Sequence, residues 1–498
     1  MLFPTILLVL LSASLSTAQN NTDPAAVPVV SVTVSTRQQF QTIDGFGISE
    51  AFNRAGSIHR LPNAIQTKVL DLLFDDTTGA GLTILRNGIG SSNSTARDYM
   101  LSIEPVSPGT NTSTPNYVST GNDSSQIWLS TAAQRYGVKT FYASAWSAPW
   151  YMKNNQDDTD GGYLCGVTGV TCPTGDWRQH FANYLVEYLT TYRSAGINVT
   201  HLGFLNEPDI SPLYAGMRSS GLQAVDFLKI LVPTLKSSGF ADVKVVCCDN
   251  SGWSIARETL GDLQGAGGEK YLDIYSAHGY SAPPDTPFNT SVPVWQTEWA
   301  DLVTPFSTLW DTGTQDYDDS GDITTEDGSD ADGLVWAGYM QDALVQSNVS
   351  AFLHWMGAEE GTGSDMLIRL NSTGTPSYTV AKRLWAYAHF GRYVKPGARR
   401  IYANSTTDAD NIDVGVSAFE NAAVGRSGVK VISVQLINRS WTAVTISMQV
   451  DGAREGGVAV PILTNEALDF QLYEEVGVRL GRVSVTIPAR SMMSLVFI

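Results

Sequence analysis

The chain has 498 residues and a globular composition, with 43% hydrophobic and 16% charged residues. Its formal net charge of −18 repels nucleic acids and anionic membranes, so we expect neither as a partner. The charge also disfavours an anionic polymer as substrate, unless a local cation binds it. The length is sufficient for two domains, or for one large barrel with an appendage.

The N-terminal residues have the pattern of a secretory signal peptide. An apolar core at residues 5–10 precedes small residues, and cleavage near Ala18 would remove residues 1–18. No later segment has the roughly 18 continuous apolar residues of a membrane span, so we expect a secreted, extracellular protein, and a monomer. Sequons for N-glycosylation support secretion and occur at Asn20, Asn93, Asn111, Asn122, Asn198, Asn289, Asn348, Asn371, Asn404 and Asn438.

Short apolar runs alternate with amphipathic stretches from residue 45 onward, which predicts strands separated by helices. Eight such units are typical of α/β proteins with a closed (β/α)8 TIM barrel. A doubly wound open sheet is the alternative, but it usually carries a Gly-rich phosphate loop that residues 45–52 do not match. The expected strands are 45–49, 82–90, 139–149, 201–208, 243–251, 272–280, 293–300 and 351–359, and the expected helices are 61–73, 177–196, 219–238, 331–347 and 379–391.

The pattern changes after about residue 394, where apolar and polar residues alternate with period two. This predicts an antiparallel β-sandwich. Residues 28–43 share the pattern, so we expect both chain ends to form one side domain with the barrel inserted between them. The expected division is 19–44 for the N-terminal sandwich strands, 45–393 for the catalytic barrel and 394–498 for the rest of the sandwich.

Cysteine is sparse, and no CxxC pair indicates zinc. Cys165 and Cys172 bracket a short Gly-rich loop, and we expect them to form a disulfide in an oxidising compartment. Cys247 and Cys248 are adjacent in an apolar run. We expect these two to remain reduced and buried in a strand.

Two expected strands end in a glutamate. Glu207 in "FLNEP" precedes a proline that cannot donate to a sheet, and Glu298 in "WQTEWA" ends another strand. These are the fourth and seventh expected strands, and catalytic groups of such barrels stand at the C-terminal strand ends. Paired carboxylates there suit glycoside hydrolysis, in which one protonates the leaving oxygen and the other attacks the anomeric carbon or activates water. Asn206 could hydrogen-bond a sugar 2-hydroxyl.

Other strand ends add candidate substrate-binding residues. Arg86 could hold Glu298 ionised, and flat aromatic rings suit the apolar faces of sugars. Each residue also has a structural explanation, because a Glu-Pro pair is usually only a turn, aromatic residues after strands are often core, and a histidine can be structural. The two glutamates, Asn206 and the tryptophans together indicate a glycosidase site more specifically than any one of these residues does. The further candidates are Trp146, His278, Tyr280, Trp299 and Trp355.

The segments "GFGISEAF", "SAWSAPWYMKNN", "FLNEP" and "WQTEWA" resemble glycoside hydrolase family 30, and the likeness is closest to the fungal secreted xylanase branch, subfamily 7. The resemblance extends over nearly the whole mature chain. It implies that Glu207 is the acid/base, that Glu298 is the nucleophile, and that cleavage proceeds by double displacement with retained configuration. It also implies that no cofactor is needed.

The resemblance leaves the polysaccharide substrate open among glucuronoxylan, plain xylan, β-1,6-glucan and glucosylceramide. Bacterial members read glucuronate with an Arg and a Tyr after strand eight, whereas this loop has acidic residues and no cation. Arg54, after the first strand, is another cation at the barrel mouth; it either binds a glucuronate or forms an ion pair, for example with Glu50. We expect a xylanase acting on cell-wall xylan, with an endo-β-1,6-glucanase or a non-catalytic carbohydrate-binding protein as alternatives.

An acidic segment, Asp316 to Asp327, has the spacing of a calcium-binding loop. Asp327 replaces the usual bidentate glutamate at the twelfth position, and no helix pattern leads into the segment. We expect a solvated loop that binds no calcium tightly.

Overall fold

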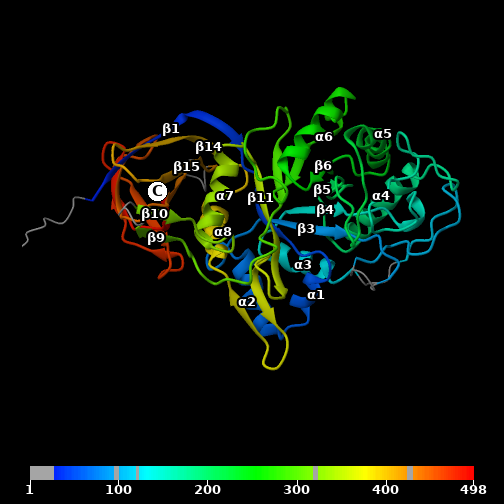
Figure 1. Cartoon of the computed structure of the whole chain (residues 1–498), viewed down its shortest axis with the longest axis horizontal. Helices are drawn as coiled ribbons and strands as arrows, with labels where there is room; N and C mark the ends of the chain where they lie inside the picture. Colours follow the sequence, from blue (N-terminus) through cyan, green and yellow to red (C-terminus); the bar gives the residue numbers. More distant parts are fainter. Residues whose placement is uncertain (1–26, 95–99, 119–122, 318–322, 423–429) are drawn as a thin grey trace, which may run out of the picture.

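The computed structural model describes residues 27–94, 100–118, 123–317, 323–422 and 430–498. The signal peptide and Asn20 and Asn122 lie outside these residues. Two units stand side by side, a barrel with its helices and a β-sheet unit built from both chain ends (Figure 1). No helix among the described residues is long and apolar enough to cross a membrane.

The barrel is formed by eight parallel strands, and each expected strand range coincides with one of them or overlaps it. Pairing of the last strand with both the first and the seventh closes the ring. In order around the barrel the strands are β2 (Gly45–Ser49), β3 (Ile84–Ile89), β4 (Thr140–Ala145), β5 (His201–Gly203), β6 (Lys244–Asn250), β7 (Ile274–His278), β8 (Val294–Glu298) and β11 (Ala351–Glu360).

Helices cover the outside of the barrel because their apolar faces pack onto the strands. Helices occur in all five expected ranges, as α2 (Asn63–Phe74), α4 (Arg178–Ser194), α5 (Gly221–Ser237), α7 (Gly333–Val345) and α8 (Arg383–Tyr393). Three helices were not predicted: α1 (Arg54–His59), α3 (Gln126–Arg135) and α6 (Trp253–Gly265). The first two have six and ten residues, too short for a clear period.

The interior of the barrel is a separate cluster of inward-pointing side chains from most of the strands, so the barrel is filled, as is typical of this fold. It contains Ile84, Tyr142, Val246, Ile274 and Trp295, all at most 1% exposed. Because this cluster fills the barrel, the space for a ligand lies above it, where the strands end.

The sheet unit joins the N-terminal strand β1 (Val29–Thr42) to the C-terminal part of the chain. β1 pairs antiparallel with β14 (Arg399–Thr406) but parallel with β17 (Val444–Asp451), so the sheet is mixed rather than purely antiparallel. The two chain ends supply both strands of that pair, so no hairpin turn imposes antiparallel pairing. The other strands are β15 (Val414–Glu420), β16 (Ile432–Asn438), β18 (Val458–Thr464), β19 (Gln471–Leu472), β20 (Val476–Gly477), β21 (Arg482–Ile487) and β22 (Ser491–Phe497).

Buried polar contacts join the two units. His389 on α8 hydrogen-bonds Ser494 at 2.7 Å and Thr464 at 2.9 Å, and both hydroxyls belong to the sheet unit. The indole of Trp310 donates to the carbonyl of Arg490 at 2.9 Å. α7 and α8 thus lie between barrel and sheet, as Figure 1 shows.

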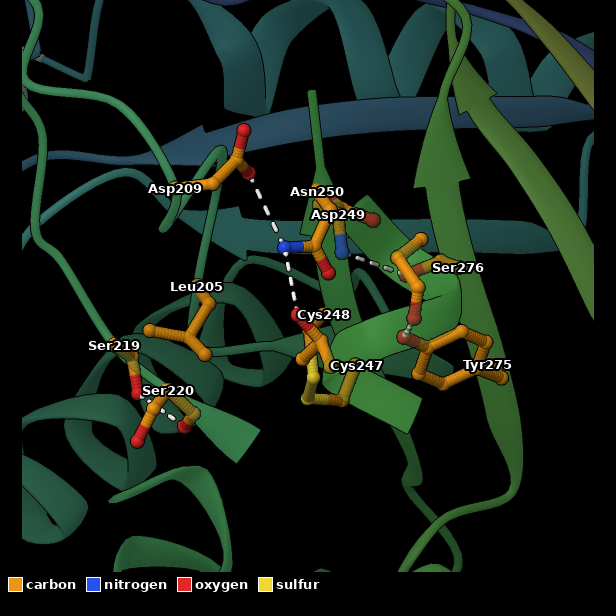
Figure 2. Close-up of a disulfide and its surroundings, with 12 residues drawn as sticks. Leu205, Asp209, Ser219, Ser220, Cys247, Cys248, Asp249, Asn250, Tyr275 and Ser276 are labelled. Atoms are coloured by element: carbon orange, nitrogen blue, oxygen red, sulfur yellow. Dashed lines mark hydrogen bonds between the residues drawn. A yellow bond between two sulfur atoms is a disulfide. The ribbon is translucent and has the colours of Figure 1, made fainter. Parts of the chain in front are cut away.

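A disulfide joins Cys165 to Cys172, as expected from the short loop between them. The expectation for Cys247 and Cys248 was wrong, because these neighbours are also joined by a disulfide (Figure 2). Strand alternation would place adjacent side chains on opposite faces, but β6 is irregular here, with a register shift against β7 between Cys248 and Asn250. Both cysteines are buried, as expected.

One predicted glycosylation site is wrong. Asn438 is fully buried, and its Nδ2 donates to the carbonyls of Thr442 and Pro488 at 2.9 and 2.8 Å, so no glycan can attach there in the folded protein. Most of the remaining sequons that the structure describes are exposed and stay predictions. Much of the acidic segment belongs to an antiparallel pair, β9 (Thr314–Tyr317) and β10 (Ile323–Glu326), while residues 318–322 lie outside the described residues.

Candidate active site

A cleft of about 880 Å³ lies at the C-terminal ends of the barrel strands. Both strand-end glutamates, Glu207 and Glu298, line it. The wall combines aromatic, apolar and charged side chains from several strand ends, including Phe52, Arg54, Trp146, Tyr214, Tyr280, Trp355 and Glu359.

Glu207 follows the short strand β5 and is only 5% exposed. Its backbone has φ 45°, in the left-handed region that non-glycine residues rarely adopt, and its N–H donates to the carbonyl of Asp249 at 2.7 Å. Asp249 has φ 51°. Such conformations persist only where the surrounding structure enforces them, and they cluster at functional sites.

Glu298 is the last residue of β8 and is 4% exposed. A carboxylate oxygen of Glu298, one of Glu207 and a ring nitrogen of His278 all lie within 4.8 Å of one another. The fold therefore brings together the two glutamates that the sequence separates. This is the close spacing of a retaining carboxylate pair, since inverting enzymes need about 6.5–9.5 Å for an intervening water.

Arg86 lies beneath this pair with no exposed surface. Its guanidinium donates to Glu298, to the Oδ1 of Asn206 at 2.6 Å and to Asp249 at 2.9 Å. The Trp146 ring covers it, with the guanidinium carbon 4.3 Å from the ring centroid. Arg86 thus contacts Glu298, as expected, and also connects three strand ends.

His278 lies between the carboxylates and is fully buried. Its Nδ1 is 3.1 Å from Glu207 and 3.7 Å from Glu298, and its Nε2 is 3.8 Å from Asp249. Burial alone would lower the pKa of His278, but Glu298, Asp249 and Glu207 outweigh it and raise the pKa to about 10. The ring is therefore an imidazolium at neutral pH.

The two glutamates have different hydrogen-bond partners. Burial raises the pKa of Glu207, but hydrogen bonds from His278 and from the Tyr214 hydroxyl at 2.8 Å outweigh it, so the pKa is lowered. The pKa of Glu298 is raised, because the effect of burial is larger than the opposing effect of the positive charges of His278 and Arg86. The Tyr280 hydroxyl donates to Glu298 at 3.0 Å, which favours the ionised carboxylate.

Sequence reasoning missed Asp249 and Tyr214. Asp249 had a signal, because it is a polar residue at the end of the apolar run of β6. Burial alone would raise the pKa of Asp249, but Arg86 and His278 have a larger effect in the opposite direction. The pKa is therefore lowered, and this carboxylate is ionised. Tyr214 stands in a loop with no periodic pattern, and only the fold brings it to Glu207.

Asn206 is 2% exposed, and its orientation is set by Arg86. The guanidinium occupies its Oδ1, while its Nδ2 has no hydrogen-bond partner among the described residues. This N–H₂ has almost no accessible surface, and Asn206 lies behind Glu207 rather than among the residues that line the cleft.

The aromatic candidates divide into two groups. Trp146 and Trp355 line the cleft, with ring centroids 5.9 Å apart, and Phe52 packs against both. Trp299 does not belong with them, contrary to our expectation. Its ring stacks on Tyr339 of α7 with centroids 4.5 Å apart and also contacts Trp336, so it packs against that helix; the register shift between β7 and β8 next to Glu298 breaks the simple alternation of the strand.

Arg54 lines the cleft and forms an ion pair, but its partner is Glu359 rather than Glu50. Its Nε is 2.5 Å from the Glu359 carboxylate. Burial raises the pKa of Glu359 to about 7, although Arg54 opposes the rise. Glu50 lies fully buried nearby, and burial raises its pKa well above the usual value.

The cluster of Glu207, His278 and Glu298 also has the composition of a metal site. A protonated imidazole has no lone pair for a metal, and both carboxylates already accept hydrogen bonds. These three residues therefore fit acid–base chemistry on a ligand better than metal coordination.

Comparison with known proteins agrees with this geometry. Residues 43–291 match the glycosyl hydrolase family 30 TIM-barrel domain. The chain belongs to glycoside hydrolase family 30. A solved family member, the catalytic domain of xylanase C from Talaromyces cellulolyticus, is 39% identical, with a TM-score of 0.82 over 94% of this chain and 100% of that chain.

Other relatives of this family 30 glycoside hydrolase are named for activities other than xylan cleavage. Putative glucosylceramidase 1 of Caenorhabditis elegans is 27% identical over 52% of this chain but only 49% of its own length. Endo-1,6-beta-D-glucanase neg1 of Aspergillus fumigatus is 24% identical over 72% of this chain and 71% of its own. The relatives within this family are named for different glycans, so membership of the family does not by itself identify the glycan that this chain cleaves.

The charge state of His278 can be measured. We expect ¹⁵N NMR of histidine-labelled protein to show both ring nitrogens of His278 protonated at pH 7, with a pKa near 10, because the carboxylates surround it. His278 would thus stabilise the fold fully below about pH 6.5 and lose that contribution as pH rises through about 10. His389, whose pKa burial lowers to about 3, is the internal control and should remain neutral. A neutral His278 at pH 7 would contradict this account.

Proposed function

We propose that this chain is a secreted retaining glycoside hydrolase that cleaves β-1,4-xylosidic bonds in xylan and glucuronoxylan, and so degrades plant cell-wall polysaccharide. The observation that carries the reaction type is the spacing of the glutamates, whose nearest carboxylate oxygens are within 4.8 Å. Retaining enzymes hold their carboxyl groups about 5–5.5 Å apart. The likeness to the Talaromyces xylanase supports the choice of xylan.

In the proposed mechanism, Glu298 is the nucleophile and Glu207 the acid/base. Glu207 donates its proton to the glycosidic oxygen while a Glu298 oxygen attacks the anomeric carbon, forming a glycosyl-enzyme ester and releasing the leaving sugar. Glu207 then removes a proton from water, which attacks the anomeric carbon and frees Glu298.

Tyr214 couples substrate binding to the proton on Glu207. In the free protein the carboxylate accepts hydrogen bonds from both Tyr214 and His278, which favours the ionised form. The leaving oxygen needs one of those positions on Glu207. Displacement of the Tyr214 hydroxyl by substrate would raise the pKa of Glu207 and favour the protonated acid that the first step requires.

Cleavage of β-1,6-glucan is the second candidate, because a curated relative of 24% identity is named an endo-1,6-beta-D-glucanase. A reducing-sugar assay on glucuronoxylan, unsubstituted xylan and β-1,6-glucan distinguishes the two. Release of sugar from β-1,6-glucan alone would contradict the proposed substrate. Release from none of them would favour a carbohydrate-binding protein on the same fold.

Azide tests the roles of the two glutamates. We expect Glu207→Ala to lose roughly 10²–10⁴-fold activity, as for removal of a general acid–base, and azide to attack its glycosyl-enzyme and give a β-glycosyl azide. In Glu298→Ala, azide should replace the nucleophile and give the α product from an activated β-glycoside. The reverse stereochemistry would exchange the two roles, and unaltered activity in either variant would refute its role.

We propose that Arg54 binds the carboxylate of a glucuronate side group on xylan. It lines the cleft, and guanidinium can hold a carboxylate through two parallel hydrogen bonds. In the free protein Glu359 occupies it, so the glucuronate must compete with that carboxylate. Because the pKa of Glu359 is raised to about 7, acid neutralises the competitor and makes Arg54 more available.

We expect Arg54→Ala to lose activity on glucuronoxylan about tenfold to a hundredfold, since a charge-assisted contact contributes about 1.5–3 kcal/mol. Activity on undecorated xylo-oligosaccharides should change much less. The measurement is kcat/KM on both substrates at pH 5 and pH 8, with the larger discrimination at pH 5. Equal losses on both substrates would make Arg54 a general cleft residue, and no loss on either would leave it only an ion-pair partner.

A further inference from the structure

A second pocket, of about 490 Å³, lies behind the turn that carries Glu207. We call it the lateral pocket; its wall comes from the loop after β4, the turn after β5, the end of β6 and the helices α5 and α6. The Asp209 carboxylate accepts from Asn250 at 3.2 Å and from the Ser251 N–H at 3.0 Å. Ser251 lines the catalytic cleft and Asn250 lines the lateral pocket, so these bonds form the partition between them.

Asn250 forms part of the buried wall of the lateral pocket. The residue is 1% exposed, and its Nδ2 donates to Asp209 and to Thr259 at 3.1 Å. Figure 2 shows this amide directed toward Asp209. Its Oδ1 has no hydrogen-bond partner among the described residues. This oxygen has almost no accessible surface, so the hydrogen-bonding groups that a ligand would meet are the other polar side chains of the wall, such as Ser219, Gln223 and Asp262.

The charges on the wall narrow the class of ligand. Asp209, Glu258 and Asp262 contribute carboxylates, and Arg218 contributes the single guanidinium of the lining residues. The excess of negative charge disfavours an anion and favours hydroxyl donors. Tyr163 and other apolar side chains of the wall offer contact area for the C–H faces of sugar rings.

We propose that the lateral pocket is a second glycan-binding site, which takes uncharged, unsubstituted sugar residues of the polysaccharide. The identity of those sugars rests on the proposed function, whereas the pocket and its preference for neutral hydroxylated rings do not. A polymer held there keeps its chain close to the cleft, because binding at one site raises the effective concentration at the other. The lateral pocket therefore acts on capture of long chains rather than on bond cleavage.

Titration calorimetry tests the proposal on the full chain with Glu298→Ala, which prevents turnover. We expect xylotriose to occupy two sites. Adding Glu258→Trp, which fills the lateral pocket from an exposed helix position, should weaken one site at least tenfold and leave the other within twofold. Glu258→Gln, which keeps the volume, is the matched control and should retain both sites. Tyr163→Ala, a second variant, should weaken the same site as Glu258→Trp.

Gentiotriose and cellotriose, titrated in parallel, separate this proposal from the proposed function. Binding of a gluco-oligosaccharide at the Glu258→Trp-sensitive site, with no binding of xylotriose, would refute xylan as substrate and uphold the pocket. A single site for all three sugars, or a second site that survives both Glu258→Trp and Tyr163→Ala, would overturn the lateral pocket whatever the cleft hydrolyses.

Discussion

The buried guanidinium of Arg86 is the interaction on which the rest of the site depends. A charge with no exposed surface is stable only if it is paired and hydrogen-bonded, and Arg86 achieves this with Glu298, Asp249 and Asn206. The two carboxylates overcompensate its charge, and Glu207 adds a third. Protonation of His278 offsets part of this excess negative charge, and the three carboxylates therefore raise the pKa of His278 although burial alone would lower it.

This charge balance also constrains the barrel. Arg86 belongs to β3, Asp249 to β6, His278 to β7 and Glu298 to β8, and Asn206 follows β5. The side chains meet only if every strand keeps its register and ends at the same height. The left-handed backbone at Glu207 and Asp249, joined by a hydrogen bond, holds the two strand ends in that position. Stability and chemistry therefore depend on the same contacts.

Much of this arrangement is visible in the sequence, since the eight apolar runs predicted the barrel strands and both strand-end glutamates reach the cleft. The sequence alone did not predict which side chains from different strands and loops contact one another across the barrel mouth. The partner of Arg54 is Glu359, which is far away in the chain, and Tyr214 reaches Glu207 from an irregular loop. Trp299 and the two adjacent cysteines depended on local strand geometry, which a periodic pattern does not resolve.

The central claim is that Arg86 and its neighbours present Glu298 as the nucleophile of a retaining xylanase. Mass spectrometry after inactivation with an activated 2-deoxy-2-fluoro-β-xylobioside tests it most directly, because the fluorine slows hydrolysis of the glycosyl-enzyme. The account predicts one xylobiosyl adduct, located on the peptide that contains Glu298 and mapped to its carboxylate. An adduct on Glu207, or continued turnover without any adduct, would contradict it.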